Sequence, residues 1–194
     1  MSSFLVNKTI GFIKKYSDFS ETDLNKINYG VEGIYLTISK IIIILLIGFI
    51  FNYLDIIILT LLFFNILRFF AFGLHAKKSI HCLILSIIEF NIIPLIFIFF
   101  DINNTFIILV GLLSFISFLL FAPSDTEKRP LTNKRKRIIR KIGSLTLCIV
   151  YVFICFKFKY LCIPICCSLI IESMMINPIC YYTLGLKYNN YKKI

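Results

Sequence analysis

Long runs of apolar residues, separated by short polar breaks, dominate the chain. They cover residues 33–51, 56–70, 80–100, 106–121, 145–156 and 161–184. The first run, with 19 residues, is long enough to cross roughly 30 Å of hydrocarbon at about 1.5 Å per helical residue. The pattern predicts an all-α integral membrane protein with about six transmembrane helices. We expect a single polytopic membrane domain over residues 1–194.

The N-terminal segment, residues 1–30, has a different pattern, because lysines interrupt its apolar positions. Lys8, Lys14 and Lys15 alternate with residues such as Phe12 and Ile13. This composition is typical of an amphipathic helix that lies in the membrane interface without crossing it. Ser20, followed by two acidic residues, is a good start for the helix that leads to the first span.

Composition places the chain outside the soluble class. Of its 194 residues 59% are hydrophobic and 16% charged, with a mean hydropathy of +0.89 and a net charge of +11. In a membrane protein such positive charge marks cytoplasmic loops and contact with anionic lipids. We therefore expect membrane lipids as partners and no nucleic acid.

The distribution of Lys and Arg predicts the orientation. They gather before the first run, in residues 68–78, in a basic loop over 122–143 and after residue 184, with none in the breaks near 53 and 102. With six spans all these segments fall on one side, which the positive-inside rule makes cytoplasmic. Both termini and residues 75–82 are then cytoplasmic. Lys157 and Lys159 are exceptions to the charge rule, because they fall on the outer side.

Candidate chemistry lies between the second and third runs. Cys82 can act as a nucleophile with His75 as its base, while Arg68, Lys77 and Lys78 supply a positive field that favours the thiolate. The alternative is a purely structural role, in which Cys82 packs as a small apolar residue and His75 lies at the membrane interface without taking part in catalysis.

The spacing of this pair constrains the backbone. In one continuous helix His75 and Cys82 would be about 10 Å apart along the axis, too far for a hydrogen bond. The chain must therefore turn after His75, with help from Gly73 upstream, and resume as a helix near Cys82. His81 would point about 100° away from Cys82 on a helix and is the poorer base.

Three further points concern supporting groups. A metal site made by His75, His81 and Cys82 matches no common zinc spacing, so no metal and no other cofactor is expected. The odd total of seven cysteines argues against a disulfide framework, and the other six are read as apolar packing. Ser86 and Glu89 share a face with Cys82 if the third span is regular; Glu89 could orient His75 or pair with Lys40 or Arg68.

Two stretches carry a resemblance to a known family. Gly73-Leu74-His75-Ala76, with Arg68 before it and Cys82 seven residues after the histidine, resembles the signature of the AgrB family of accessory gene regulator proteins. The stretch 122–131, Ala-Pro-Ser-Asp-Thr-Glu-Lys-Arg-Pro-Leu, resembles the second recognisable segment of that family, at the start of its basic loop.

The resemblance implies a membrane cysteine endopeptidase, a thiol protease of the bacterial cell membrane that acts in quorum sensing. Its partner would be an AgrD-like pro-peptide with an acidic C-terminal tail, and the resemblance also implies a homodimer. Cys82 would release the tail and retain the peptide as a thioester. An internal thiol or hydroxyl would then close a thiolactone or lactone ring.

The basic loop has two interpretations. Lys134, Arg135, Lys136 and Arg137 could attract the acidic tail, or they could be a solvated loop that only fixes topology. Other functions also stay open. A small peptide transporter or exporter would use Glu89, Glu172 and Lys40 as pathway charges, and a scaffold would use no catalytic residue.

Overall fold

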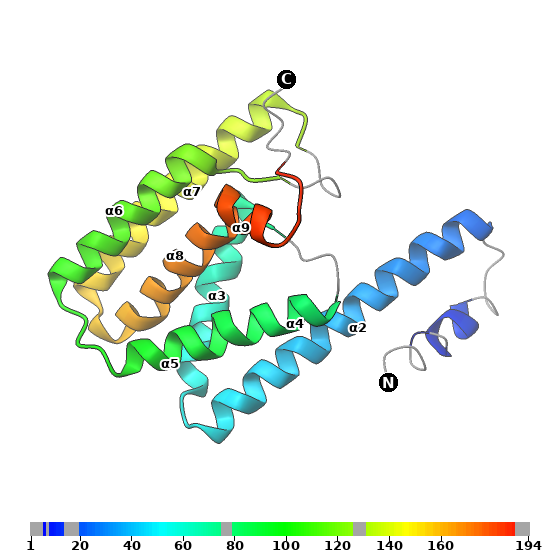
Figure 1. The fold of residues 1–194 in the computed structure, drawn as a ribbon, viewed down its shortest axis with the longest axis horizontal. Coiled ribbons are helices and arrows are strands. Elements are labelled where there is room, and N and C mark those ends of the chain that lie inside the picture. Colours follow the sequence, from blue (N-terminus) through cyan, green and yellow to red (C-terminus); the bar gives the residue numbers. More distant parts are fainter. Residues whose placement is uncertain (1–5, 7, 14–19, 75–78, 126–130, 189–194) are drawn as a thin grey trace. The chain divides into compact units, whose positions relative to one another are not determined.

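The computed structural model describes residues 6, 8–13, 20–74, 79–125 and 131–188. Within these residues the chain is helical, without a named strand, and packs as two compact units, 1–47 and 48–194. The elements after the N-terminal segment are α2 (Glu21–Ile50), α3 (Leu54–Ala71), α4 (Ser79–Ile87), η1 (Ile88–Ile92), α5 (Ile93–Ile98), α6 (Asn104–Phe121), α7 (Lys134–Lys157), η2 (Lys159–Leu161), α8 (Cys162–Ile176) and α9 (Pro178–Thr183) (Figure 1).

Six helical stretches are long and apolar enough to cross a membrane. They are Glu21–Ile50, Leu54–Ala71, Ile80–Ile98, Asn104–Phe121, Lys134–Lys157 and Lys159–Ile176. The prediction of an all-α membrane protein with about six spans is therefore confirmed.

In the first unit, residues 8–13 are helical and a second helix, α2, begins after Ser20. The side chain of Ser20 caps α2, because its Oγ accepts a hydrogen bond from the backbone N–H of Asp23 at 3.2 Å. The predicted helix start is thus confirmed. Residues 21–30, which the sequence analysis included in the interfacial segment, form the first turns of α2, because the helix begins at its cap and not at the start of the apolar run.

The second unit is built around α8. In its span 61% of the residues are buried, against 17–28% in the other spans that lie within this unit, so α8 is enclosed by protein where the others face outward. It packs against α3, α6 and α7 (Figure 1). Leu67 of α3, Phe118 of α6, Cys148 of α7 and Ile165 of α8 are among the buried residues of this core.

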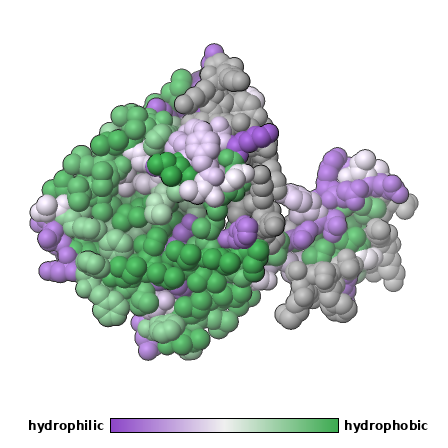
Figure 2. Space-filling view, in the orientation of Figure 1, coloured by the Kyte–Doolittle hydropathy of each residue, from purple (hydrophilic) through white to green (hydrophobic). Residues whose placement is uncertain are grey.

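The outward faces of this unit are apolar. On α6 the exposed side chains include Leu109, Leu112, Leu113, Ile116 and Leu120. Figure 2 shows hydrophobic residues over most of the visible face of the helical body. A soluble protein would bury such faces, whereas lipid tails are apolar enough to cover them.

Two helix boundaries differ from the apolar runs. The helix α7 begins at Lys134 and not near residue 145, because Asn133 caps it by accepting from the Lys136 N–H at 3.2 Å and because Lys and Arg are good helix formers. The last run is broken at Asn177–Pro178, where proline prevents α8 from continuing.

The third span is not a regular helix. Its middle turn, η1, is a π-helix that ends just before Pro94. Pro94 has no N–H, and its ring crowds the carbonyl four residues earlier, which belongs to Phe90 of η1. Glu89 lies in this widened turn, so the helical register that the sequence assumed from Cys82 holds through Ser86 and changes at Glu89.

Candidate functional site

The chain leaves α3 through a turn that needs glycine. Phe72 and Gly73 have φ angles of 64° and 118°, in the region that L side chains rarely adopt. A Cβ on Gly73 would also lie 3.0 Å from Arg68 Nη1 and 3.3 Å from Met175 Cβ. The turn after His75 that the sequence predicts, with help from Gly73, lies outside the described residues and stays a prediction.

The segment after α3, residues 72–74, is hydrogen-bonded to Ser124 in the segment after α6, and we call this contact the clasp. Ser124 donates its N–H to the carbonyl of Ala71 at 2.9 Å, and its own carbonyl accepts from the Gly73 N–H at 2.9 Å, so that Phe72 and Ser124 form a parallel bridge. The Leu74 N–H donates to the carbonyl of Met175 at 3.0 Å. The two stretches that carry the sequence resemblance therefore meet in space immediately before His75.

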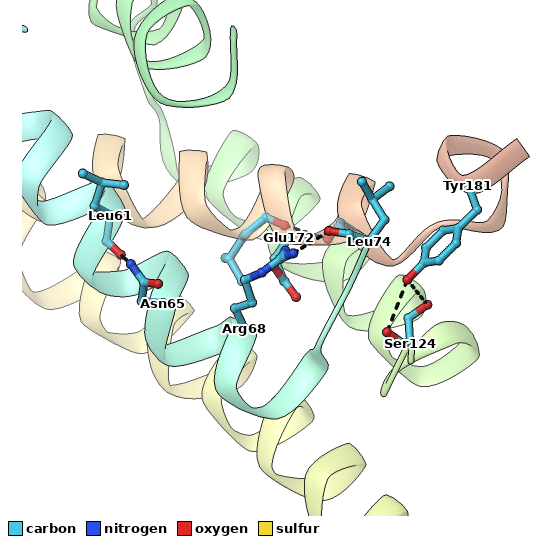
Figure 3. A network of polar contacts seen from close by, with 9 residues as sticks. Leu61, Asn65, Arg68, Leu74, Ser124, Glu172 and Tyr181 are labelled. Atoms are coloured by element: carbon cyan, nitrogen blue, oxygen red, sulfur yellow. Dashed lines mark hydrogen bonds and ion pairs between the residues drawn. The ribbon is translucent and has the colours of Figure 1, made fainter. Parts of the chain in front are cut away.

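Arg68 holds the end of this clasp from inside the bundle (Figure 3). Its Nη2 donates to the carbonyl of Leu74 at 2.6 Å, and its Nη1 lies 3.5 Å from Oε2 of Glu172, which is fully buried. The guanidinium also lies over the ring of Phe64, with Arg68 Cζ 5.3 Å from the ring centroid. The sequence placed Arg68 in the positive field around Cys82, with Glu89 as a candidate partner. In the structure Glu172 is the acid that lies beside Arg68 Nη1.

Tyr181 of α9 holds the other side of the clasp (Figure 3). Its hydroxyl donates to the carbonyl of Ser124 at 3.3 Å and accepts from the Ser124 hydroxyl at 3.1 Å. Burial raises the pKa of Tyr181 to about 12, so the hydroxyl remains a donor at neutral pH. Nothing in the sequence pointed to Tyr181.

A second buried acid ties the clasp to the basic helix α7. Asp125 is fully buried and accepts from the Leu131 N–H at 2.9 Å and from Arg137 Nη1 at 3.1 Å. Arg137 Nη2 also donates to the carbonyl of Pro123 at 3.4 Å. One turn on, Arg140 bonds the carbonyl of Phe69. The sequence grouped Arg137 with the cations for an acidic tail, but in the structure it is engaged by Asp125.

The remaining three cations of that group stay on the surface. Lys134, Arg135 and Lys136 are exposed in the first turn of α7. Among the described residues none of the three forms an ion pair. They remain candidates for contact with an anionic partner.

Cys82 lies in α4, three residues after the helix begins at Ser79, and its thiol is half-buried and not in a disulfide. Ser86 is on the same face of α4, one turn further on. The predicted partners His75, Lys77 and Lys78 lie outside the described residues, so the catalytic pair remains a prediction.

None of the seven cysteines, all of which lie within the described residues, is in a disulfide. Across the part of the chain that the structure describes, no three His, Cys, Asp or Glu residues are placed to hold a metal ion.

Comparison with known proteins decides the family. A family model described as Accessory gene regulator B matches residues 6–177. The chain belongs to the accessory gene regulator B family.

Relatives of accessory gene regulator B type align over most of their length with this chain. A putative AgrB-like protein of Clostridium acetobutylicum is 31% identical over 181 residues, 92% of this chain and 87% of the relative. One from Listeria innocua is 33% identical over 172 residues, 87% of this chain and 83% of the relative. Accessory gene regulator protein B of Staphylococcus aureus (strain Newman) is 30% identical over 179 residues, 91% of this chain and 93% of the relative. No solved structure matches the chain.

Membership of the accessory gene regulator B family supports a role in the processing of an accessory gene regulator autoinducer peptide. Together with six apolar helices it indicates a multi-pass membrane protein.

Proposed function

We propose that this protein is a membrane cysteine endopeptidase that removes the acidic C-terminal tail of an AgrD-type pro-peptide. The family supports peptide processing. The observation that carries the proposal is the clasp of residues 72–74 with Ser124, which anchors the chain directly before His75, while Cys82 stands near the start of the next helix. A nucleophile and a base on separate, anchored backbones can meet, whereas on one helix they cannot.

The chemistry follows from the thiol. His75 removes the proton of Cys82, and the thiolate attacks the carbonyl carbon of the scissile peptide bond. The amide C–N bond breaks, and His75 returns the proton to the departing amine of the tail. The signal peptide is left as a thioester on Cys82.

Ring closure uses the same thioester. A thiol or hydroxyl within the bound peptide attacks the carbonyl carbon, the bond to the Cys82 sulfur breaks, and the proton of the attacking group returns to that sulfur. The product is a thiolactone or a lactone. A nucleophile tethered in the same peptide is favoured over water by its high effective concentration.

The charges on α7 provide a place for the tail. Lys134, Arg135 and Lys136 are exposed, and an acidic tail would be attracted to them over a Debye length of about 8 Å at physiological salt. By the positive-inside rule this face is cytoplasmic, with both termini and the site on the same side. Anionic lipids and a second copy of the chain complete the proposed partners.

The test is co-expression of the full chain with an AgrD-type pro-peptide, followed by mass analysis of the products. Cys82→Ala and His75→Ala should each abolish cleavage while the protein still inserts, because nucleophile and base act as a unit. His81→Ala should cost much less. Cys180→Ala is the matched control, since Cys180 is likewise half-buried and outside any disulfide. Peptide export that survives Cys82→Ala but is lost in Glu89→Gln would point to a transporter instead.

A further inference from the structure

Two buried charges face each other inside the second unit, and stability alone does not explain them. Glu172 on α8 is fully buried, and the side chain of Arg68 on α3 is only 18% exposed. Removing two ions from water costs several kcal/mol for each, and apolar residues of similar volume often stabilise a protein as well or better. The pair is therefore expected to serve something else in the molecule.

The pair ends on a particular peptide group. Arg68 Nη2 donates to the carbonyl of Leu74 at 2.6 Å, a short, charge-assisted hydrogen bond. That carbonyl belongs to the peptide group that joins Leu74 to His75. The hydrogen bond therefore holds the backbone at Leu74, the residue directly before His75 in the sequence.

Glu172 determines where the guanidinium can lie. Nη1 lies 3.5 Å from Oε2 of Glu172, within ion-pair range but without a hydrogen bond. Because a guanidinium is rigid and planar, attraction at Nη1 favours the orientation that points Nη2 at Leu74. The missing side chain of Gly73 gives Nη1 its space, since a Cβ there would be 3.0 Å away. The Phe64 ring covers the guanidinium at 5.3 Å. In Figure 3 Arg68 lies between Glu172 and Leu74.

We propose that Glu172 is a positioning residue of the peptidase site. It orients Arg68, which holds the Leu74–His75 peptide group so that His75 can take the proton of Cys82. Glu172 acts only through Arg68. This inference rests on the proposed function, in which Cys82 and His75 work as a pair.

The test measures Cys82 without any peptide substrate. The full-length protein in detergent is treated with iodoacetamide over a pH series, and alkylation of Cys82 is followed by peptide mass mapping. In the wild type a paired thiol reacts quickly near neutral pH. His75→Ala should slow that reaction by about tenfold or more, with the rates converging at high pH where thiols ionise without help.

The deciding variant removes both buried charges together, Arg68→Met with Glu172→Leu. It leaves no unpaired charge in the bundle, so it should fold and insert. Near neutral pH its Cys82 should react as slowly as in His75→Ala. Glu172→Gln, which keeps an acceptor but loses the charge, should lie between the two. Glu32→Gln is the control, because it makes the same change at an exposed position.

The outcomes separate the two levels of the proposal. If His75→Ala leaves the alkylation profile unchanged, the proposed catalytic pair is wrong. If His75→Ala slows alkylation while the folded double variant reacts like the wild type, the pair is only structural and the role of Glu172 is refuted. If the double variant does not fold, a wild-type alkylation profile in Glu172→Gln refutes the role of Glu172 equally.

Discussion

Replacing Gly73 by alanine should destabilise the protein and disable the site together. The residue has a φ of 118°, and an added Cβ would lie 3.0 Å from Arg68 Nη1, 3.3 Å from Met175 Cβ and 3.4 Å from the Met175 carbonyl oxygen. A side chain in this backbone region costs about 1–3 kcal/mol. Crowding against Arg68 Nη1 and Met175 Cβ adds about 1–3 kcal/mol more. We expect a total loss of about 2–6 kcal/mol in the free energy of unfolding.

Gly185→Ala is the matched control. Gly185 also has a positive φ, 61°, but nothing lies within 4 Å of an added Cβ. Only the backbone cost of about 1–2 kcal/mol applies there. The free energy of unfolding of both variants is measured by SDS titration in mixed micelles, and peptide cleavage is measured in parallel. Equal losses at the two glycines, or full cleavage by Gly73→Ala, would show that the crowded turn beside Arg68 does not matter.

Three further changes test other parts of the site. Lys134→Gln with Lys136→Gln should weaken pro-peptide binding by up to about tenfold at low salt, and the effect should fade as the salt concentration rises. The control in this binding assay is a pro-peptide with a neutral tail. An equal loss of affinity for that control would refute docking of the tail on α7. Asp125→Ala should lower the free energy of SDS unfolding by about 3–5 kcal/mol because Arg137 loses a buried partner, and Asp125→Asn should lower it by less. An unchanged free energy of unfolding in Asp125→Ala would contradict this. Tyr181→Phe should lower the free energy of unfolding by about 1 kcal/mol at neutral pH. Because burial raises the pKa of Tyr181 to about 12, its stabilisation is complete below about pH 10 and is lost as the pH rises through 12, so the difference from the wild type should shrink over that range.

The membrane fold could be predicted because it depends on local composition. Apolar runs bounded by polar breaks were enough to count six spans, and Ser20 was recognised as a cap from three following residues. Boundaries set by interactions outside the runs were missed. The start of α7 depends on Asn133, which lies well before the apolar residues of that helix.

The site was only partly predictable, because its contacts join distant parts of the chain. Gly73 and Arg68 stand out beside the candidate pair, but no sequence pattern says that Arg68 pairs with Glu172, which lies about a hundred residues further along the chain. Asp125 lies in the second resembling stretch, and its burial beside Arg137 could have been suspected from the basic residues that follow. Tyr181 follows a proline break in an otherwise apolar tail and carried no signal.

Direct detection of the acyl-enzyme tests the central claim most sharply. The protein and an AgrD-type pro-peptide whose internal cyclising residue is changed to alanine are mixed, quenched in acid and analysed by intact mass. The thioester then has no tethered nucleophile to resolve it. The account predicts a covalent adduct of the tail-less peptide that maps to Cys82, is released by hydroxylamine and is absent in Cys82→Ala. Release of the tail with no adduct, or an adduct that persists in Cys82→Ala, would contradict it.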